Sequence, residues 1–243
     1  MVSVNQNRLA AVIAFAIILM IGLGVTAMGN EQFQTETRAT VRELGLAQGR
    51  VIEEYLNRAL SATYALASII QQSTRIDSFD QLASDMMQRY GGIDGLFIAP
   101  DGVISLMYPV TGNEAAFGYN LLTDPQNGAG AYAAIESRQL YLVGPFALGQ
   151  DGTGISGRYP VFRTNPRTGM KGFWGFTIVL INLDRLLQDA HLAQLAARGY
   201  DYELSRPLDN SDARDVFAES ITGPMIDPER IEVTLPGATW ELA

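Results

Sequence analysis

The feature that most constrains this chain is an uncharged stretch near its N-terminus. Residues 9–28 read LAAVIAFAIILMIGLGVTAM, twenty residues without a charged side chain. A helix needs about 20 apolar residues to cross the roughly 30 Å hydrocarbon layer of a bilayer. Signal peptides have a shorter apolar region of about 7–15 residues, although Val25-Thr26-Ala27 would serve as a cleavage site. We therefore expect a transmembrane helix over 9–28, with a cleaved signal peptide as the alternative.

Charge orients the expected helix in the bilayer. Arg8 and the N-terminal amine precede it, whereas Glu31 and Glu36 follow it. Because positive charge favours the cytoplasmic side, we expect residues 1–8 to be a cytoplasmic tail. The bulk of the chain would then be periplasmic or extracellular, with a single pass through the plasma membrane. The formal net charge of −9 repels phosphate backbones and argues against a nucleic-acid partner.

The residues that most catalytic and metal sites need are scarce. The chain has no cysteine and one histidine, His191. Thiolate nucleophiles and thiolate ligands are therefore excluded, and a Ser-His-Asp triad or a zinc site would depend on that histidine alone. His191 lies in a helical-looking stretch with no nucleophile nearby, so we expect a surface position. The sequence predicts no catalytic site, metal or cofactor, and an exported hydrolase is the least favoured function.

A long amphipathic helix is expected after the apolar stretch. Apolar and small residues recur at a three-four spacing from Ile52 to Ile70, which is typical of a helix with one buried face. We predict a stalk helix over 29–75 through which the chain forms homodimers. Its weakest turn is expected at Gly45 and Gly49, because each glycine costs up to about 1 kcal/mol relative to alanine.

Alternating patterns from residue 76 to 183 predict an antiparallel α+β domain. A short helix, capped by Ser78 and Gln81, should end at Gly91-Gly92. Two strands, a helix that starts near Asp124-Pro125, and three more strands follow. This order predicts a PAS-like five-stranded sheet with helices on one face. The expected strands are Ile93–Ala99, Val103–Tyr108, Leu140–Leu148, Ile155–Arg163 and Gly172–Ile181.

A smaller unit is expected after the sheet. Residues 184–198 should form a connecting helix, capped by Asn182 or Asp184 and closed by Gly199. Residues 199–243 then predict a membrane-proximal α/β subdomain with strands at YDYEL (200–204) and IEVTLPGATWELA (231–243), and a loop around Leu208–Arg214. The last residues still have a strand pattern, so we interpret this subdomain as truncated.

Five segments in order carry a family resemblance. They are APDGVISLMYPVTGNEAAFGYNLL (99–122), GPFALGQDGTGISGRYPVF (144–162), GFWGFTIVLINLDRLL (172–187), YDYEL (200–204) and LPGATWELA (235–243). Together they resemble the CHASE family, the extracellular sensory domains of histidine kinases, diguanylate cyclases and phosphodiesterases. The resemblance implies a membrane-distal PAS-like subdomain and a smaller proximal one. A second spanning helix and a cytoplasmic output domain would normally follow.

A pocket in the PAS-like sheet would be mostly apolar with a few polar groups. Asn113 and Glu114 are candidate polar contacts, and Arg138 and Arg158 are candidates for a carboxylate or phosphate. Glu114 would alternatively cap a helical turn, the arginines would form internal ion pairs, and each aromatic residue would simply be core. The candidate apolar lining is Tyr108, Tyr141, Val143, Phe146, Phe162, Trp174 and Phe176.

The resemblance places a pocket border at Val143-Gly144-Pro145-Phe146. The plant hormone-receptor branch of the family has a threonine at the position of Val143, so the hydroxyl donor of that branch is absent here. The sequence as a whole predicts an extracytoplasmic small-ligand sensor that signals through its stalk helix to a histidine kinase or a cyclic-di-GMP enzyme. A structural or protein-binding periplasmic domain without a small ligand is the alternative.

Overall fold

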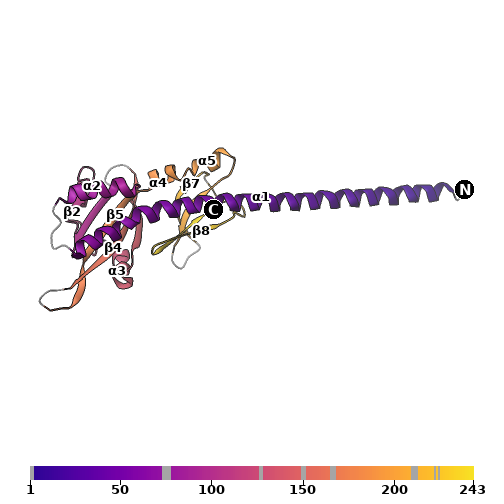
Figure 1. Ribbon diagram of the computed structural model, residues 1–243. Coiled ribbons are helices and arrows are strands. Elements are labelled where there is room, and N and C mark those ends of the chain that lie inside the picture. Colours follow the sequence, from indigo (N-terminus) through magenta and orange to yellow (C-terminus); the bar gives the residue numbers. More distant parts are fainter. Residues whose placement is uncertain are drawn as a thin grey trace. The chain divides into compact units, whose positions relative to one another are not determined.

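The computed structural model divides the chain into two units, residues 1–44 and 45–243. It describes residues 3–72, 78–125, 128–148, 152–164, 168–208, 213–221, 223 and 225–243, although side chains before residue 36 are described only at Met20. Helix α1 spans Ser3–Gln72 (Figure 1). The expected transmembrane residues 9–28 fall in this helix, but their side chains, Met20 excepted, lie outside the described residues. Among the residues that are described, no helix is both long and apolar enough to cross a membrane.

The second unit begins with the end of α1, whose apolar stripe is buried as the spacing predicts. Leu56, Ala59 and Leu66 are fully buried, and Ile52 and Ile70 are at most 1% exposed. Thr63, also on this stripe, is buried, and its carbonyl accepts a hydrogen bond from Thr177 Oγ1 at 3.0 Å. This end of α1 therefore packs on the sheet as part of the core.

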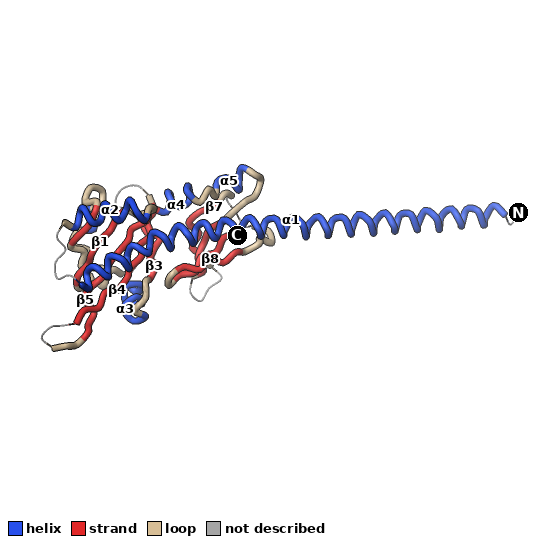
Figure 2. Tube along the Cα trace, viewed as in Figure 1, coloured by secondary structure: helices blue, strands red, loops and turns tan. Residues whose placement is uncertain are grey.

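The expected five-stranded antiparallel sheet is confirmed (Figures 1 and 2). Its strand order is β2-β1-β5-β4-β3. The second strand is three residues shorter at its start than the pattern predicts, because Val103 makes an isolated bridge with Asn120 instead. The strands are β1 Gly95–Pro100, β2 Leu106–Tyr108, β3 Tyr141–Ala147, β4 Thr153–Thr164 and β5 Lys171–Asn182.

Helices cover both faces of this sheet, so the prediction of helices on one face is wrong. Gly157 of β4 faces α1, where a β-carbon would meet the side chain of Leu60. Val143 of β3 lies on the opposite face, since it pairs with Ser156, one residue before Gly157. There it packs near Gly130 of helix α3, Gly128–Ser137. The small residues of α3 allow this helix to pack closely against the second face of the sheet.

Two helix starts differ from the sequence-based expectation. Helix α2, Phe79–Tyr90, ends at Gly91 as predicted. Ser78 makes no side-chain capping bond because its backbone is left-handed, and Gln81 bonds instead to Asp85 within the helix at 2.9 Å. Helix α3 begins at Gly128, later than the predicted start at Asp124-Pro125, and residues 126–127 are outside the described part.

The connecting helix predicted over 184–198 is two short helices. Helix α4 spans Leu183–Asp189 and α5 spans Ala193–Ala197. The break comes at His191, which has a positive φ of 55° that no α-helix accommodates. Asn182 caps α4 as predicted, accepting from the Arg185 N–H at 2.9 Å. His191 is exposed, which confirms its predicted surface position.

The C-terminal unit is a second antiparallel sheet with the order β7-β6-β9-β8. Its strands are β6 Glu203–Pro207, β7 Arg214–Glu219, β8 Ile231–Leu235 and β9 Ala238–Leu242. The sequence pattern predicted no strand at β7, and it predicted a single strand over 231–243 where the structure has β8 and β9. They are a hairpin, because Gly237 adopts a positive φ of 68° and reverses the chain.

The two glycines predicted to weaken α1 are where this second sheet approaches the helix. A β-carbon on Gly45 would lie 2.8 Å from Ile231 Cγ1, and one on Gly49 would lie 3.4 Å from Val233 Cγ2. Glu53, one turn further, accepts the Thr234 N–H at 2.9 Å. The glycines therefore form a flat strip against which β8 packs.

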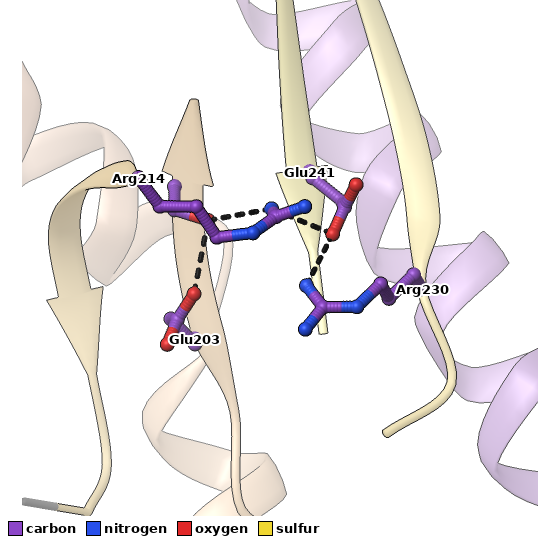
Figure 3. A network of polar contacts seen from close by, with 5 residues as sticks. Glu203, Arg214, Arg230 and Glu241 are labelled. Atoms are coloured by element: carbon purple, nitrogen blue, oxygen red, sulfur yellow. Dashed lines mark hydrogen bonds and ion pairs between the residues drawn. The ribbon is translucent and has the colours of Figure 1, made fainter. Parts of the chain in front are cut away.

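A polar network joins strands β6, β7 and β9 of the second sheet to the residue before β8 (Figure 3). Glu241 on β9 pairs with Arg214 of β7 at 2.7 Å and with Arg230, which precedes β8. Arg214 also donates to Ser205 Oγ at 3.3 Å, and Ser205 donates to Glu203 at 3.0 Å on β6. Burial alone would raise the pKa of Glu241, but Arg230 and Arg214 outweigh it and hold that pKa below its ordinary value.

Replacing Glu241 by glutamine should lower the free energy of unfolding by about 1 kcal/mol at pH 7. A lowered carboxyl pKa stabilises the fold above its ordinary value of 4.5, and that stabilisation is lost as the pH falls through the folded-state value. The difference between wild type and Glu241→Gln should therefore shrink below about pH 4.5. Urea unfolding from pH 7 to 3 measures it, with the exposed Glu219→Gln as the control. A pH-independent difference would contradict the ionic network.

Candidate functional site

A cavity of about 580 Å³ lies on the face of the five-stranded sheet opposite α1. Strands β1, β4 and β5 form its floor, and the end of β3 and the segment 109–124 form its walls. Binding pockets for small molecules usually measure about 300–1,000 Å³ and combine apolar walls with a few polar groups. This cavity has both the size and the position of such a pocket.

The floor of the cavity contains two polar side chains among apolar ones. Ser156 and Arg158 of β4 both point into the cavity, because alternate residues of a strand share a face. They pair with Leu180 and Ile178 of β5, and Phe97 of β1 lies beyond Ile178. Ser156 is 4% exposed and Arg158 is 3% exposed. Among the described residues, the Ser156 hydroxyl has no hydrogen-bond partner.

The segment 109–124 is held in place by its own backbone and side chains. It contains the 3₁₀ helix η1, Glu114–Ala116. Asn113 Nδ2 donates to the Pro109 carbonyl at 3.0 Å, which closes the turn before η1. The Ile104 N–H donates to the Tyr119 carbonyl at 3.0 Å and ties the far end of the segment to the chain between β1 and β2. The wall is thus a structured loop.

Arg158 carries a positive charge inside the cavity. Burial lowers the pKa of its guanidinium to about 10, while Asp124 and Tyr119 act in the opposite direction. The group is therefore ionised at neutral pH. Burial, and then a hydrogen bond to Asp124, raise the pKa of Tyr119. Arg158, Asp124 and Tyr119 together form a polar cluster between the floor and the wall.

A second carboxylate, Asp94, lies further along the floor. Asp94 Oδ2 accepts the Asn182 N–H at 2.7 Å, and Oδ1 pairs with Arg185 of α4 at 2.7 Å. Asn182 is four residues from Ile178, which pairs with Arg158, so the two polar regions are about 13 Å apart along the strand. The charge of Asp94 is already matched by Arg185.

The structure brings three of the predicted site residues together in this cavity. Asn113, Phe146 and Arg158 all line it. Phe146 comes from β3 and is the last residue of the predicted pocket border, where the strand register shifts between Val143 and Phe146. That these three residues contact a ligand stays a prediction.

Three other predicted residues lie near the cavity without lining it. Tyr108 pairs with Leu96 and so shares the opposite face of the sheet. Val143 is 6% exposed and packs near Gly130 of α3. Glu114 is exposed and accepts the Gly112 N–H at 2.9 Å, which is the capping role weighed as its alternative.

The remaining candidates lie outside the cavity lining. Arg138 is exposed with a positive φ of 57°, and its guanidinium lies 4.8 Å from the centre of the Phe162 ring. Trp174 lies under Arg163, at 5.5 Å. Of the two further aromatic candidates, Phe176 belongs to the hydrophobic core and Tyr141 is partly buried and packs against that core.

Sequence reasoning missed Ser156, Tyr119, Asp124 and Asp94. Ser156 was accessible to it, since a residue two positions before Arg158 on a strand shares its face. Asp124 was taken for a helix start, and Tyr119 for part of a helical turn. The loop that carries both has no periodic pattern from which their direction follows.

Comparison with known proteins identifies the family. Residues 52–216, more than half of the chain, match the family model of the CHASE domain. This chain belongs to the CHASE family. The resemblance seen in the sequence is confirmed, and CHASE is a sensory rather than a catalytic domain. No curated protein sequence matches the chain.

Solved structures with the same fold have sensory or receptor names. The extracellular ligand binding receptor from Desulfohalobium retbaense DSM5692 is 14% identical with a TM-score of 0.59, and the match covers 84% of this chain but only 39% of that one. The sensory domain of the Campylobacter jejuni chemoreceptor Tlp3 (CcmL) is 12% identical, with a TM-score of 0.57 and coverage of 87% and 94%. The extracellular domain of the putative histidine kinase soHK1S-Z6 is 14% identical, with a TM-score of 0.52 and coverage of 88% and 95%. At these identities the CHASE chain shares their fold.

Proposed function

We propose that this CHASE domain is the extracytoplasmic small-ligand sensor of a membrane-bound receptor, with the ligand held in the cavity at Arg158. The observation that carries the proposal is a cavity of about 580 Å³ that contains the buried guanidinium of Arg158 and the buried Ser156 hydroxyl. The Ser156 hydroxyl has no hydrogen-bond partner among the described residues. Buried polar groups normally have partners. A ligand would supply one.

The membrane anchor and the output remain parts of this proposal. The uncharged residues 9–28 support a single pass, with residues 1–8 in the cytoplasm and the sensor outside. Homodimers would form through α1, and the signal would go to a histidine kinase or a cyclic-di-GMP cyclase or phosphodiesterase. In this arrangement, residues 76–183 would be the membrane-distal PAS-like subdomain and residues 199–243 the proximal one.

The contacts of two strands that line the cavity support a route from the cavity to the rest of the domain. Strand β3, which supplies Phe146, also contacts the second sheet: the Leu142 N–H donates to the Pro236 carbonyl at 2.9 Å, and Arg206 donates to the Gly144 carbonyl. Strand β4, which supplies Arg158, contacts α1 through its other face. A ligand shifts this packing only by its difference in affinity for the two states.

A protein-binding function is the second candidate, and exposed apolar residues favour it. Val110 is 54% exposed and Phe117 is 68% exposed, both on the segment that walls the cavity. Exposed apolar patches can mark protein contacts. In this case the cavity would need no small ligand.

Thermal unfolding of the full chain in detergent separates the two candidates. We expect at least one compound from a panel of purines, amino acids, sugars and small carboxylates to raise the midpoint by about 5–10 °C at 100 times its Kd. Arg158→Gln should abolish this shift. Arg163→Gln, on the same strand but outside the cavity, should keep it. A panel without any hit would favour the protein-binding function.

A further inference from the structure

The charges that line the cavity are balanced in a specific way. Its lining includes one cation, Arg158, and two carboxylates, Asp94 and Asp124. Asp94 is matched by Arg185 outside the floor, so Arg158 and Asp124 set the local charge. A ligand with a net charge would bring an uncompensated charge into this buried region, which is costly.

Donors for an oxyanion converge on the floor. Ser156 lies two residues before Arg158 on β4, and both side chains point into the cavity. The Ser156 hydroxyl is buried and lacks a hydrogen-bond partner among the described residues. An arginine fork beside a hydroxyl matches the two oxygens of a carboxylate, and hydrogen bonds between charged groups are about twice as strong as neutral ones.

An acceptor for a cationic group lies next to these donors. The negative charge of Asp124 acts on Arg158, and Asp124 accepts a hydrogen bond from Tyr119. A carboxylate has about four lone-pair positions. Asp124 therefore keeps acceptor capacity toward the cavity after bonding Tyr119.

The rest of the lining is apolar and leaves room for a side chain. Phe97, Ile178 and Leu180 form the floor beyond Arg158, and Phe146 and Leu121 form the walls. Such surfaces favour an apolar ligand body by about 25 cal/mol per Å² removed from water. The polar and apolar parts of the cavity thus adjoin one another.

From this arrangement we infer that the ligand is a small zwitterion with an apolar side chain, such as an apolar α-amino acid. The inference rests on the proposed sensor function. The ligand carboxylate bonds Arg158 and Ser156, the ammonium bonds Asp124, and the side chain lies on Phe97, Ile178 and Leu180. A simple carboxylate or a simple amine would add a net charge to the cavity, beside Asp124 or Arg158 of the same sign. A zwitterion adds no net charge and offers each of these two side chains a group of opposite sign.

Matched analogues test the inference on the full chain in detergent. The probes are L-leucine and L-phenylalanine, their desamino analogues 4-methylpentanoate and 3-phenylpropanoate, and their descarboxy analogues isoamylamine and phenethylamine. We expect at least one amino acid to bind about 10- to 100-fold more tightly than both of its analogues by calorimetry, since each analogue brings a net charge into a buried region and loses one hydrogen bond between charged groups. Equal affinity for an amino acid and either analogue would overturn the inference.

Variants assign the two ends of the ligand. Asp124→Asn should lower the ratio of the affinity for the amino acid to the affinity for its desamino analogue by about tenfold. Arg158→Gln should lower the corresponding ratio for the descarboxy analogue by a similar factor. Arg163→Gln should leave both ratios unchanged. Ratios are informative even where a variant loses some stability, because both ligands are measured on the same protein. Ratios unchanged in Asp124→Asn and Arg158→Gln would contradict the assignment.

The broad panel distinguishes failure of this inference from failure of the sensor function. If purines or sugars stabilise the wild-type chain and the amino acids do not, the zwitterion is wrong and the sensor function stands. If no compound in the panel stabilises the chain, both are rejected.

Discussion

Replacing Gly157 by valine should lower the free energy of unfolding by about 1–3 kcal/mol, the usual cost of overpacking a core. Gly157 lies on the face of β4 that contacts α1, where its β-carbon would overlap the Leu60 side chain. Leu60 is 1% exposed and belongs to the packed core. Because valine favours strands, a lower free energy of unfolding would come from the contact with α1 and not from the strand itself. Urea unfolding followed by circular dichroism measures it.

A matched glycine and a double-mutant cycle control this experiment. Gly172 of β5 has nothing within 4 Å of its would-be β-carbon, so Gly172→Val should be neutral. Leu60→Ala alone should lose about 2–5 kcal/mol through the cavity it leaves. Combined with Gly157→Val, it should lose less than the sum of the two, because the valine fills part of that space. Additive losses would show that the two residues do not share one contact.

Replacing Trp240 by alanine should have the largest effect in the second sheet, a loss of about 3–5 kcal/mol. Trp240 is 1% exposed and is the largest fully buried side chain of the described residues. It also meets Phe217 of β7 edge to face at 4.8 Å, across the intervening β6. Its removal therefore leaves a cavity that reaches three strands. Thermal unfolding and limited proteolysis after residue 200 report on this sheet.

The second tryptophan of the chain provides the control. Trp174 is only partly buried and lies beneath Arg163 at the far end of β5, so Trp174→Ala should lose markedly less stability than Trp240→Ala. It should also leave proteolysis of residues 200–243 unchanged. Comparable losses in the two variants would mean that Trp240 is not the centre of the second core.

The first sheet was predictable because its signals are local and repeated. β4 and β5 are long strands rich in β-branched and aromatic residues and buried over most of their length, with turn residues between them, and α1 carries its apolar stripe from Ile52 to Ile70. The second sheet was predicted only in part: strands were expected at 200–204 and 231–243, but β7 was missed because it is partly exposed throughout and its apolar residues do not alternate. The turn between β8 and β9 depends on Gly237 alone, against which Tyr141 of the first sheet packs. Sequence patterns do not contain that tertiary contact.

The candidate site was predictable only where strands carry it. Arg158 stood out as a charge inside an apolar strand, and it lies at the centre of the cavity floor. Arg138 looked equivalent in the sequence but follows the end of α3 with a left-handed backbone, which turns it to solvent. The wall residues Tyr119 and Asp124 depend on the path of a loop, and loops have no period to read.

The packing of Ile231 on Gly45 has a further consequence for how the domain is joined to other segments. Ile231 pairs with Leu242 across the β8–β9 hairpin, so the point where the polypeptide enters this unit and the point where it leaves are near neighbours. A segment that continued after Ala243 would therefore start near Gly45 of α1. If that segment were a helix, a small rotation of the domain would change the spacing between it and α1 at Gly45.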